Sequence, residues 1–394
     1  MRSSLGSFGV GGGVCLAVLS MQMSADEATA QNTTRVDTIA DGISCASCPV
    51  RVSPVTTLRG SGDSVRIIPH SNVVRDSRGR YFVAPIGESR AVAVYDERGP
   101  LLALLRVPTI REENNDGIQL IRIGPGDSLH VVVSGGYVVY TPELHRIRQV
   151  HLRSGGRVND AIPLDSGRVV VQSVSMTPDL IGHPFHVAAA DGRIERSFGY
   201  DGEVISFADP LSLYWSFSAA EQGRFWAARR NRYIVTKMDV LGGSHTILYR
   251  EAAWFPAWDG DGNGQPWISH PEPHLWSHWS DREDRLWLMS TIADHRWQPI
   301  GGMPDDRESL DRLIGQVDSY LDTVIEVIDV AGNRLVATQR EDEVFQKVGD
   351  GFIFRLVMEP SSNRFAVEIH HIDIEPSSER VTPRGGSDIL HRWK

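Results

Sequence analysis

Short apolar runs alternate with polar corners along this chain from about residue 50 to residue 375. The clearest unit spans residues 76–102, where turns at 76–79 and 96–99 each join two strand-like runs. Apolar and polar positions alternate with a period of about two before each turn, which indicates half-buried antiparallel strands. Two turns with the runs on either side of them make one four-stranded unit.

The first turn of this unit recurs, so that the chain holds six copies of a Gly or Asp corner followed by an apolar strand. The corners are Gly79, Asp127, Gly167, Gly223, Asp284 and Asp350. Gly and Asp suit such corners because a tight hairpin turn requires a positive φ. The corners are separated by 48, 40, 56, 61 and 66 residues, and each interval has room for about four strands of five or six residues with their turns. The repeat predicts an all-β fold, a six-bladed β-propeller of four-stranded antiparallel blades.

The D-x-x-G-x-[YFW] form of these corners resembles NHL-type blades. The layout, with a CxxC at Cys45 and Cys48 soon after an apolar N-terminal segment, is similar to that of exported bacterial six-bladed β-propeller proteins. The likeness runs from about Cys45 to Ile374. Such proteins usually carry a G-x-G-P-G-E-F segment after the first blade, whereas residues 111–117 here read REENNDG. The motifs are architectural, so the resemblance implies the fold and carries no active site.

The last unit lacks one strand, because only residues 352–358 and 365–374 follow its corner before the chain turns polar. We expect residues 50–59 to supply the missing outer strand, which would close the ring with an N-terminal strand and remove exposed sheet edges. The propeller is therefore predicted to span residues 50–375. Residues 31–49 are expected to be a linker that contains the CxxC, and residues 376–394 a polar C-terminal tail.

Residues 1–30 are predicted to be a signal peptide. Arg2 gives a weak positive region, residues 5–19 are apolar, and 28–30 (ATA) offer a cleavage site. We therefore expect an exported protein, periplasmic or extracellular. Lipidation at Cys15 is the less favoured alternative, because the expected upstream Leu is missing and apolar sequence continues beyond it.

The exported context makes Cys45 and Cys48 candidates for a local disulfide. No later segment approaches the roughly 20 apolar residues of a membrane span. The formal net charge of −10 argues against a nucleic-acid partner. We expect a monomer that binds a protein or a small molecule such as a carbohydrate.

Two segments break the repeat. One is the link between blades four and five, residues 251–275; the other is an insertion near residues 293–320 inside blade five. The insertion follows from the two turns of that blade, Asp281 and Asp329, which are 48 residues apart where the corresponding turns of blade one are 20 apart. The connections of an up-and-down blade alternate between the two faces of the ring, so both segments fall on the same channel mouth. Residues 310, 313, 314 and 317 have the spacing of an amphipathic helix.

Aromatic and histidine residues concentrate in these segments, with seven of the ten Trp residues between 254 and 297. Trp287 repeats an apolar strand position and is expected in the core. The others could form a platform for a sugar or peptide ligand, or could pack the link against the ring. The candidate ligand-binding residues are Trp254, Trp258, Trp267, His274, Trp276, His278 and Trp297.

Asp259, Asp261 and Asn263, followed by Gly264, resemble the start of an EF-hand-type calcium loop. Position 12 of that loop is His270, where a bidentate Glu is expected. The sequence thus predicts either a calcium site at these three residues or a polar, Gly-rich turn.

No nucleophile elbow, HExxH, phosphate-binding loop or dinucleotide fingerprint occurs in the chain. The leading hypothesis is a propeller that binds a ligand or protein, without catalysis, at the mouth built by residues 251–278 and 293–320. The alternative is a propeller-type hydrolase or lyase, similar to lactonases, that uses a metal in the central channel. A third hypothesis is a structural module of a larger assembly.

Overall fold

The computed structural model describes residues 34–43, 48–61, 65–87, 89–110, 117–133, 135–153, 158–173, 183–199, 215–241, 245–258, 269–299, 306–349 and 351–375. All of them belong to one compact unit, Asn32–Lys394. The expected signal peptide, the C-terminal tail, Cys45, the calcium-loop residues Asp259, Asp261 and Asn263, and Trp267 lie outside the described residues. The calcium site and the disulfide of Cys45 with Cys48 therefore stay predictions.

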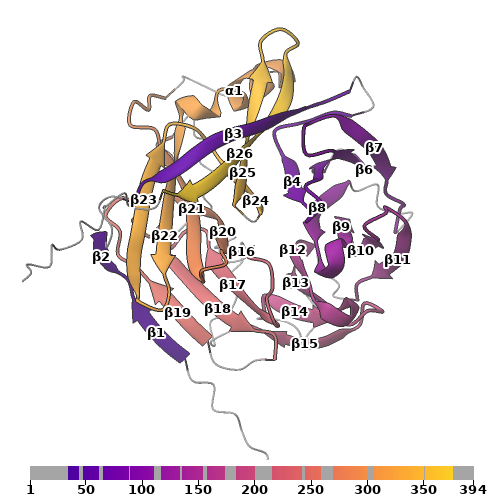
Figure 1. The fold of residues 1–394 in the computed structure, drawn as a ribbon, viewed down its shortest axis with the longest axis horizontal. Coiled ribbons are helices and arrows are strands. Elements are labelled where there is room, and N and C mark those ends of the chain that lie inside the picture. Colours follow the sequence, from indigo (N-terminus) through magenta and orange to yellow (C-terminus); the bar gives the residue numbers. More distant parts are fainter. Residues whose placement is uncertain are drawn as a thin grey trace, which may run out of the picture. The chain divides into compact units, whose positions relative to one another are not determined.

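The described chain forms six antiparallel blades arranged in a ring (Figure 1). Blade one consists of β4 (Ser71–Arg75), β5 (Tyr81–Pro85), β6 (Ala91–Tyr95) and β7 (Leu101–Arg106). Blade two consists of β8 (Ile118–Ile123), β9 (Leu129–Val133), β10 (Gly136–Tyr140) and β11 (Arg146–His151). Blade three consists of β12 (Val158–Pro163), β13 (Val169–Ser173), β14 (Phe185–Ala188) and β15 (Ile194–Phe198). Short 3-10 turns at Pro125–Asp127 and Asp165–Gly167 form the first corners of blades two and three.

The second half of the ring includes the longest strands of the blades and the two irregular segments. Blade four consists of β16 (Trp215–Phe217), β17 (Arg224–Arg229), β18 (Ile234–Asp239) and β19 (His245–Tyr249). Blade five consists of β20 (His274–Ser280), β21 (Arg285–Ala293), β22 (Leu321–Asp329) and β23 (Arg334–Glu341). Blade six contains β24 (Gln346–Gly349), β25 (Phe352–Glu359) and β26 (Arg364–Ile374).

In every blade the first strand in sequence contacts its counterparts in both neighbouring blades, and β24 contacts β4 to complete the ring. Successive strands then follow outward in chain order. The six-bladed fold with four antiparallel strands per blade is therefore confirmed. Apolar side chains fill the spaces between neighbouring blades; Val74 and Phe82 of blade one, for example, pack with Val131 of blade two.

Closure of the ring by an N-terminal strand is also confirmed. Strand β3 (Val50–Arg59) pairs antiparallel with β26, in a register that runs from Val50 opposite Ile374 to Arg59 opposite Ala366. Leu58 in this strand is fully buried. The predicted outer strand of blade six thus comes from the start of the propeller sequence.

The segment expected to be a linker differs from that expectation, because it includes two short strands. β1 (Thr34–Thr38) adds parallel to β19, and β2 (Ala40–Ile43) adds parallel to β23. With β3, these strands lie along the outer edges of blades four, five and six (Figure 1). Their polar sequence gave no strand signal because an outermost strand needs backbone hydrogen bonds and few buried side chains.

The repeated corners have the backbone conformation that their residue types favour. The φ of Gly79 is 84°, that of Asp127 is 59° and that of Asp284 is 61°. Asp76 stabilises the first corner, since its carboxylate accepts hydrogen bonds from the backbone N–H of Arg80 at 2.9 Å and from its guanidinium at 2.8 Å. These turns serve folding.

The connections fall on two faces. We call the side with the first and third turns of each blade the turn face, and the side with the second turns and the links between blades the link face. The insertion between β21 and β22 lies on the link face and contains α1 (Arg307–Ile314) and a 3-10 turn (Val317–Ser319). The helix prediction is therefore confirmed. A methyl group added at Gly315 would lie 2.9 Å from Cε of Met358 on β25, so the insertion packs closely on blade six.

Candidate functional site

The link and the insertion contact each other on the link face. The rings of His270 in the link and Trp297 in the insertion lie 5.3 Å apart, centroid to centroid, at 70°. His270 is exposed and Trp297 is half-buried. The described parts of the two irregular segments therefore contact each other beside blade five.

Trp254 belongs to the interior of this surface. Its ring lies 6.0 Å from that of Tyr233 and 5.6 Å from that of Phe255, both in edge-to-face geometry. Tyr233 and Phe255 are buried in the core between blades four and five. The position of Trp254 accords with the packing alternative for this residue.

Trp258 is held in place by polar contacts. Its indole Nε1 donates to the carbonyl of Pro273 at 2.7 Å, and the Asn231 side-chain amide donates to the Trp258 carbonyl at 2.9 Å. The indole is half-buried and lies edge-on to the imidazole of His274, with centroids 4.9 Å apart.

Trp276 is the exposed member of the group, with 40% of its surface accessible. Its Nε1 donates to the hydroxyl of Thr291, and the guanidinium carbon of Arg230 lies 4.7 Å from its ring centroid. The ring centroid of His274 lies 5.7 Å from that of Trp276. We call Trp258, His274, Trp276 and Arg230 the Trp276 cluster.

His274 is neutral at physiological pH. Burial, together with the nearby Arg230 charge, lowers its pKa to about 4. Its Nδ1 is buried and has no hydrogen-bond partner among the described residues. A buried polar atom in this condition costs about 1–3 kcal/mol, so a ligand or water that reached it would gain a hydrogen bond.

His278 lies in the core and does not reach the surface of the link face. It is fully buried between blades four and five, where Nε2 is 2.8 Å from the Trp226 carbonyl and Nδ1 is 3.3 Å from the Ser216 hydroxyl. Burial lowers its pKa to about 3. The four-residue spacing does not indicate that His278 is buried while His274 reaches the link face, because the register of β20 shifts between Leu275 and Ser277.

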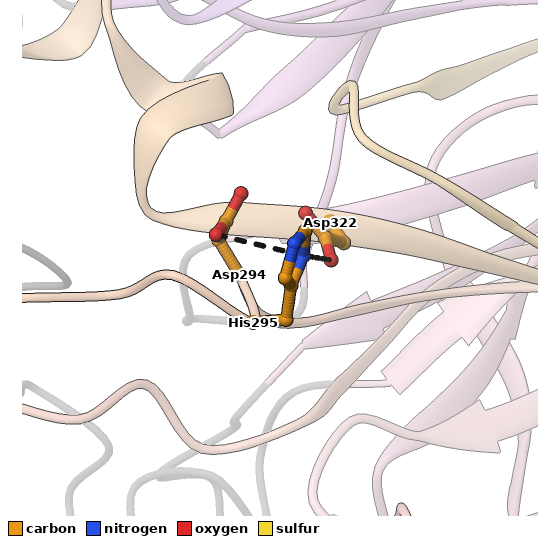
Figure 2. A group of neighbouring side chains, drawn as sticks. All are labelled: Asp294, His295 and Asp322. Carbon is orange, nitrogen blue, oxygen red and sulfur yellow. Dashed lines mark ion pairs between the residues drawn. The ribbon is translucent and has the colours of Figure 1, made fainter.

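A second group of polar side chains lies at the base of the insertion. Asp294 begins the insertion and Asp322 follows its end, and the imidazole of His295 lies between their carboxylates (Figure 2). Nδ1 of His295 is 3.8 Å from an oxygen of Asp294 and 4.0 Å from an oxygen of Asp322. The backbone N–H of Asp294 donates to the Tyr320 carbonyl at 2.9 Å, which brings the two ends of the insertion together.

Each of the two carboxylates also has an arginine partner. The Arg296 guanidinium contacts Asp294 and holds the pKa of that carboxyl below its ordinary value. Arg340 contacts Asp322, but burial of Asp322 outweighs this ion pair and raises its pKa. Sequence reasoning missed this group. The sequence does place one Asp at each end of the insertion, next to a long apolar strand. These are the Asp residues of IAD at 292–294 and of LDT at 321–323.

Among the described residues, Asp294, His295 and Asp322 are the one group of three His, Cys, Asp or Glu side chains placed to share a metal ion. They lie at the rim of blade five, away from the innermost strands. No helix among the described residues has the length and apolar character that a bilayer crossing requires.

Comparison with known proteins supports the fold. No family model matches the sequence, and no curated protein matches it. Among solved structures, a member of the DUF4221 family from Bacteroides vulgatus is similar with a TM-score of 0.53 at 8% identity, covering 83% of this chain and 99% of that one. A protein from Bacteroides fragilis that is named as exported has a TM-score of 0.53 at 8% identity, covering 87% of this chain and all of the other. Virginiamycin B lyase from Staphylococcus aureus has a TM-score of 0.45 at 8% identity, covering 81% of this chain and 99% of the lyase.

These identities are low enough that the likeness concerns the fold alone. The chain is a six-bladed β-propeller with two irregular segments on its link face.

Proposed function

We propose that this protein is an exported propeller that binds a ligand on its link face, at the Trp276 cluster, and that catalysis is not part of its role. The observation that carries the proposal is the exposure of Trp276. Among the described Phe, Tyr and Trp residues, only Trp276 is exposed to solvent. A large apolar ring left in water beside the most irregular connections of the ring favours a binding surface over a packing role.

The polar neighbours of Trp276 define the chemistry of the ligand. An indole face suits the apolar face of a sugar or an aromatic group, and Arg230 supplies a cation beside it. His274 adds a neutral nitrogen without a partner among the described residues. This combination fits a carbohydrate with hydroxyl or carboxylate substituents. A protein partner that inserts an apolar side chain is the alternative.

Calorimetric titration with soluble oligosaccharides of neutral hexoses, N-acetylhexosamines and uronic acids tests the proposal. We expect Trp276→Ala to weaken binding by about 30-fold, the effect of removing a central aromatic anchor worth about 2 kcal/mol. Leu241→Ala is the matched control, because Leu241 is 71% exposed and lies on the turn face. Equal affinity in the wild type and Trp276→Ala would refute the site, and absence of binding to all three sugar classes would refute the carbohydrate ligand.

The alternative hypothesis of a hydrolase or lyase with a channel metal receives no support from the described innermost strands. The metal-competent group of the described residues lies elsewhere.

A further inference from the structure

The base of the insertion is unusual in its electrostatics. Asp294 is 3% exposed and Asp322 is completely buried, yet their carboxylates face the same imidazole. One oxygen of each lies within 4.8 Å of the other and of Nδ1 of His295. Two buried carboxylates this close repel each other, and such an arrangement needs a compensating positive charge.

The two arginine partners balance the charges of the two carboxylates but leave one hydrogen-bond acceptor unfilled. Arg340 contacts only Oδ2 of Asp322. The other oxygen, Oδ1, is buried and has no hydrogen-bond partner among the described residues. A buried carboxylate oxygen without a donor is costly, and it belongs to the same carboxylate that faces His295. The unfilled acceptor thus belongs to a carboxylate whose other oxygen, Oδ2, faces His295 and is contacted by Arg340.

We propose that Asp294, His295 and Asp322 bind a divalent transition metal ion of the zinc class, which fixes the two ends of the insertion to each other. This inference is independent of the ligand proposed for the Trp276 cluster. The three side chains supply one imidazole nitrogen and two carboxylate oxygens, with room for water at further positions. The mixture of nitrogen and oxygen ligands favours zinc over calcium, which takes oxygen ligands.

The distances require a small contraction. Ligand atoms around a tetrahedral zinc ion lie about 3.4 Å apart, given metal–ligand bonds of about 2.0–2.1 Å, whereas the imidazole nitrogen is now 3.8 and 4.0 Å from the two oxygens. His295 can supply this movement because its side chain is 55% exposed. The two Asp residues are held by their strands and by Arg296 and Arg340.

Arg296 competes with the proposed ion. Its backbone N–H and its guanidinium both contact Oδ1 of Asp294, the oxygen nearest to His295. The guanidinium is 64% exposed, so solvent weakens its ion pair with Asp294. Removing it should strengthen metal binding modestly, which a purely structural role of the cluster would not predict.

Calorimetric titration of the metal-free full-length protein with zinc chloride at pH 7.5, followed by a thermal melt, tests the proposal. We expect one zinc ion per chain and a higher Tm with zinc. His295→Ala should weaken zinc binding at least about tenfold, and Arg296→Ala should strengthen it about two- to fivefold. His295→Ala is the principal variant because its exposed side chain is dispensable for folding, which circular dichroism verifies.

His371→Ala is the matched control. His371 is also partly exposed and lies 3.7 Å from a carboxylate, that of Asp373, but no second carboxylate completes its site. This variant should bind zinc as the wild type does. Failure to bind zinc would overturn the proposal, as would equal affinity in the wild type and His295→Ala. A parallel titration with calcium chloride separates the two metals, because tighter binding of calcium than of zinc would overturn the assignment of the metal.

Discussion

Glu326 is the residue on which the interface between blades four and five should depend most. It lies in β22 of blade five and accepts hydrogen bonds from the Tyr233 hydroxyl and the Arg250 guanidinium of blade four. The side chains of Arg250 and Glu326 are 7% and 2% exposed. The three residues form a buried ionic connection between two blades that are separated in sequence by the long link.

Replacement of Glu326 by Gln preserves the shape of the side chain and removes its charge. Buried Arg250 then loses the carboxylate of Glu326 as its ion-pair partner. Breaking a buried pair in this way costs about 3–5 kcal/mol. The exposed pair between Glu359 and Arg59, with side chains 27% and 63% accessible, provides the matched control. Glu359→Gln should cost no more than about 1 kcal/mol.

Urea unfolding followed by circular dichroism measures both effects. We expect Glu326→Gln to lower the free energy of unfolding by about 3–5 kcal/mol, and Arg250→Met in the same chain to restore most of that loss by removing the buried guanidinium that has lost the Glu326 carboxylate. A loss below about 1 kcal/mol, equal to that of Glu359→Gln, would show that Arg250 is solvated and that the reasoning fails. If the double variant is no more stable than Glu326→Gln, the buried charge of Arg250 is not the cause of the lost stability.

Two further predictions concern ring closure and pH. Leu58→Ala should cost about 2–5 kcal/mol because it creates a cavity between β3 and the core, whereas Val55→Ala, at a position 45% exposed, should cost less than about 1 kcal/mol; equal losses in urea unfolding would argue against closure by β3. Burial lowers the pKa of His278 to about 3 and of His130 to about 4, below the value of about 6.5 in an unfolded chain. The unfolded state therefore binds more protons, so stability is lost as pH falls from about 6.5 toward about 4, by up to about 1.4 kcal/mol per pH unit for each residue. His278→Gln should reduce that slope, and an unchanged slope would contradict a neutral buried His278.

The architecture was predictable because a propeller repeats its local signals. Corners such as Gly79 and Asp284 have a positive φ, and the residue types that favour this conformation recur once in each blade. The missing strand of blade six followed from counting, and residues 50–59 were the remaining strand-like segment. β1 and β2 escaped prediction because they pair through the backbone at an outer edge, where neither burial nor alternation marks the sequence.

The candidate sites were less predictable because they depend on contacts between segments far apart in the chain. Sequence reasoning named both His274 and His278 as candidate ligand-binding residues, but β20 directs one toward Trp276 and buries the other against blade four. Trp254 and Trp276 have the same residue type, and only the packing on Tyr233 distinguishes the partly buried residue from the exposed one. Asp294 and Asp322 are 28 positions apart and meet because the insertion returns to its starting point.

The reinforcement of the ring is concentrated in the blades that carry the irregular segments. Strands β1 and β2 add a fifth strand at the outer edges of blades four and five, whereas β3 is the ordinary fourth strand of blade six. Blades four and five also carry the link, the insertion and the Glu326 ion pair, and among the described residues the outer strands β3, β7, β11 and β15 of the other four blades have no added strand. A binding surface built on long connections needs rigid strands beneath it, because side chains on a moving support lose their mutual geometry. The two added strands therefore support, independently of the exposure of Trp276, the proposed binding surface on the link face of blades four and five.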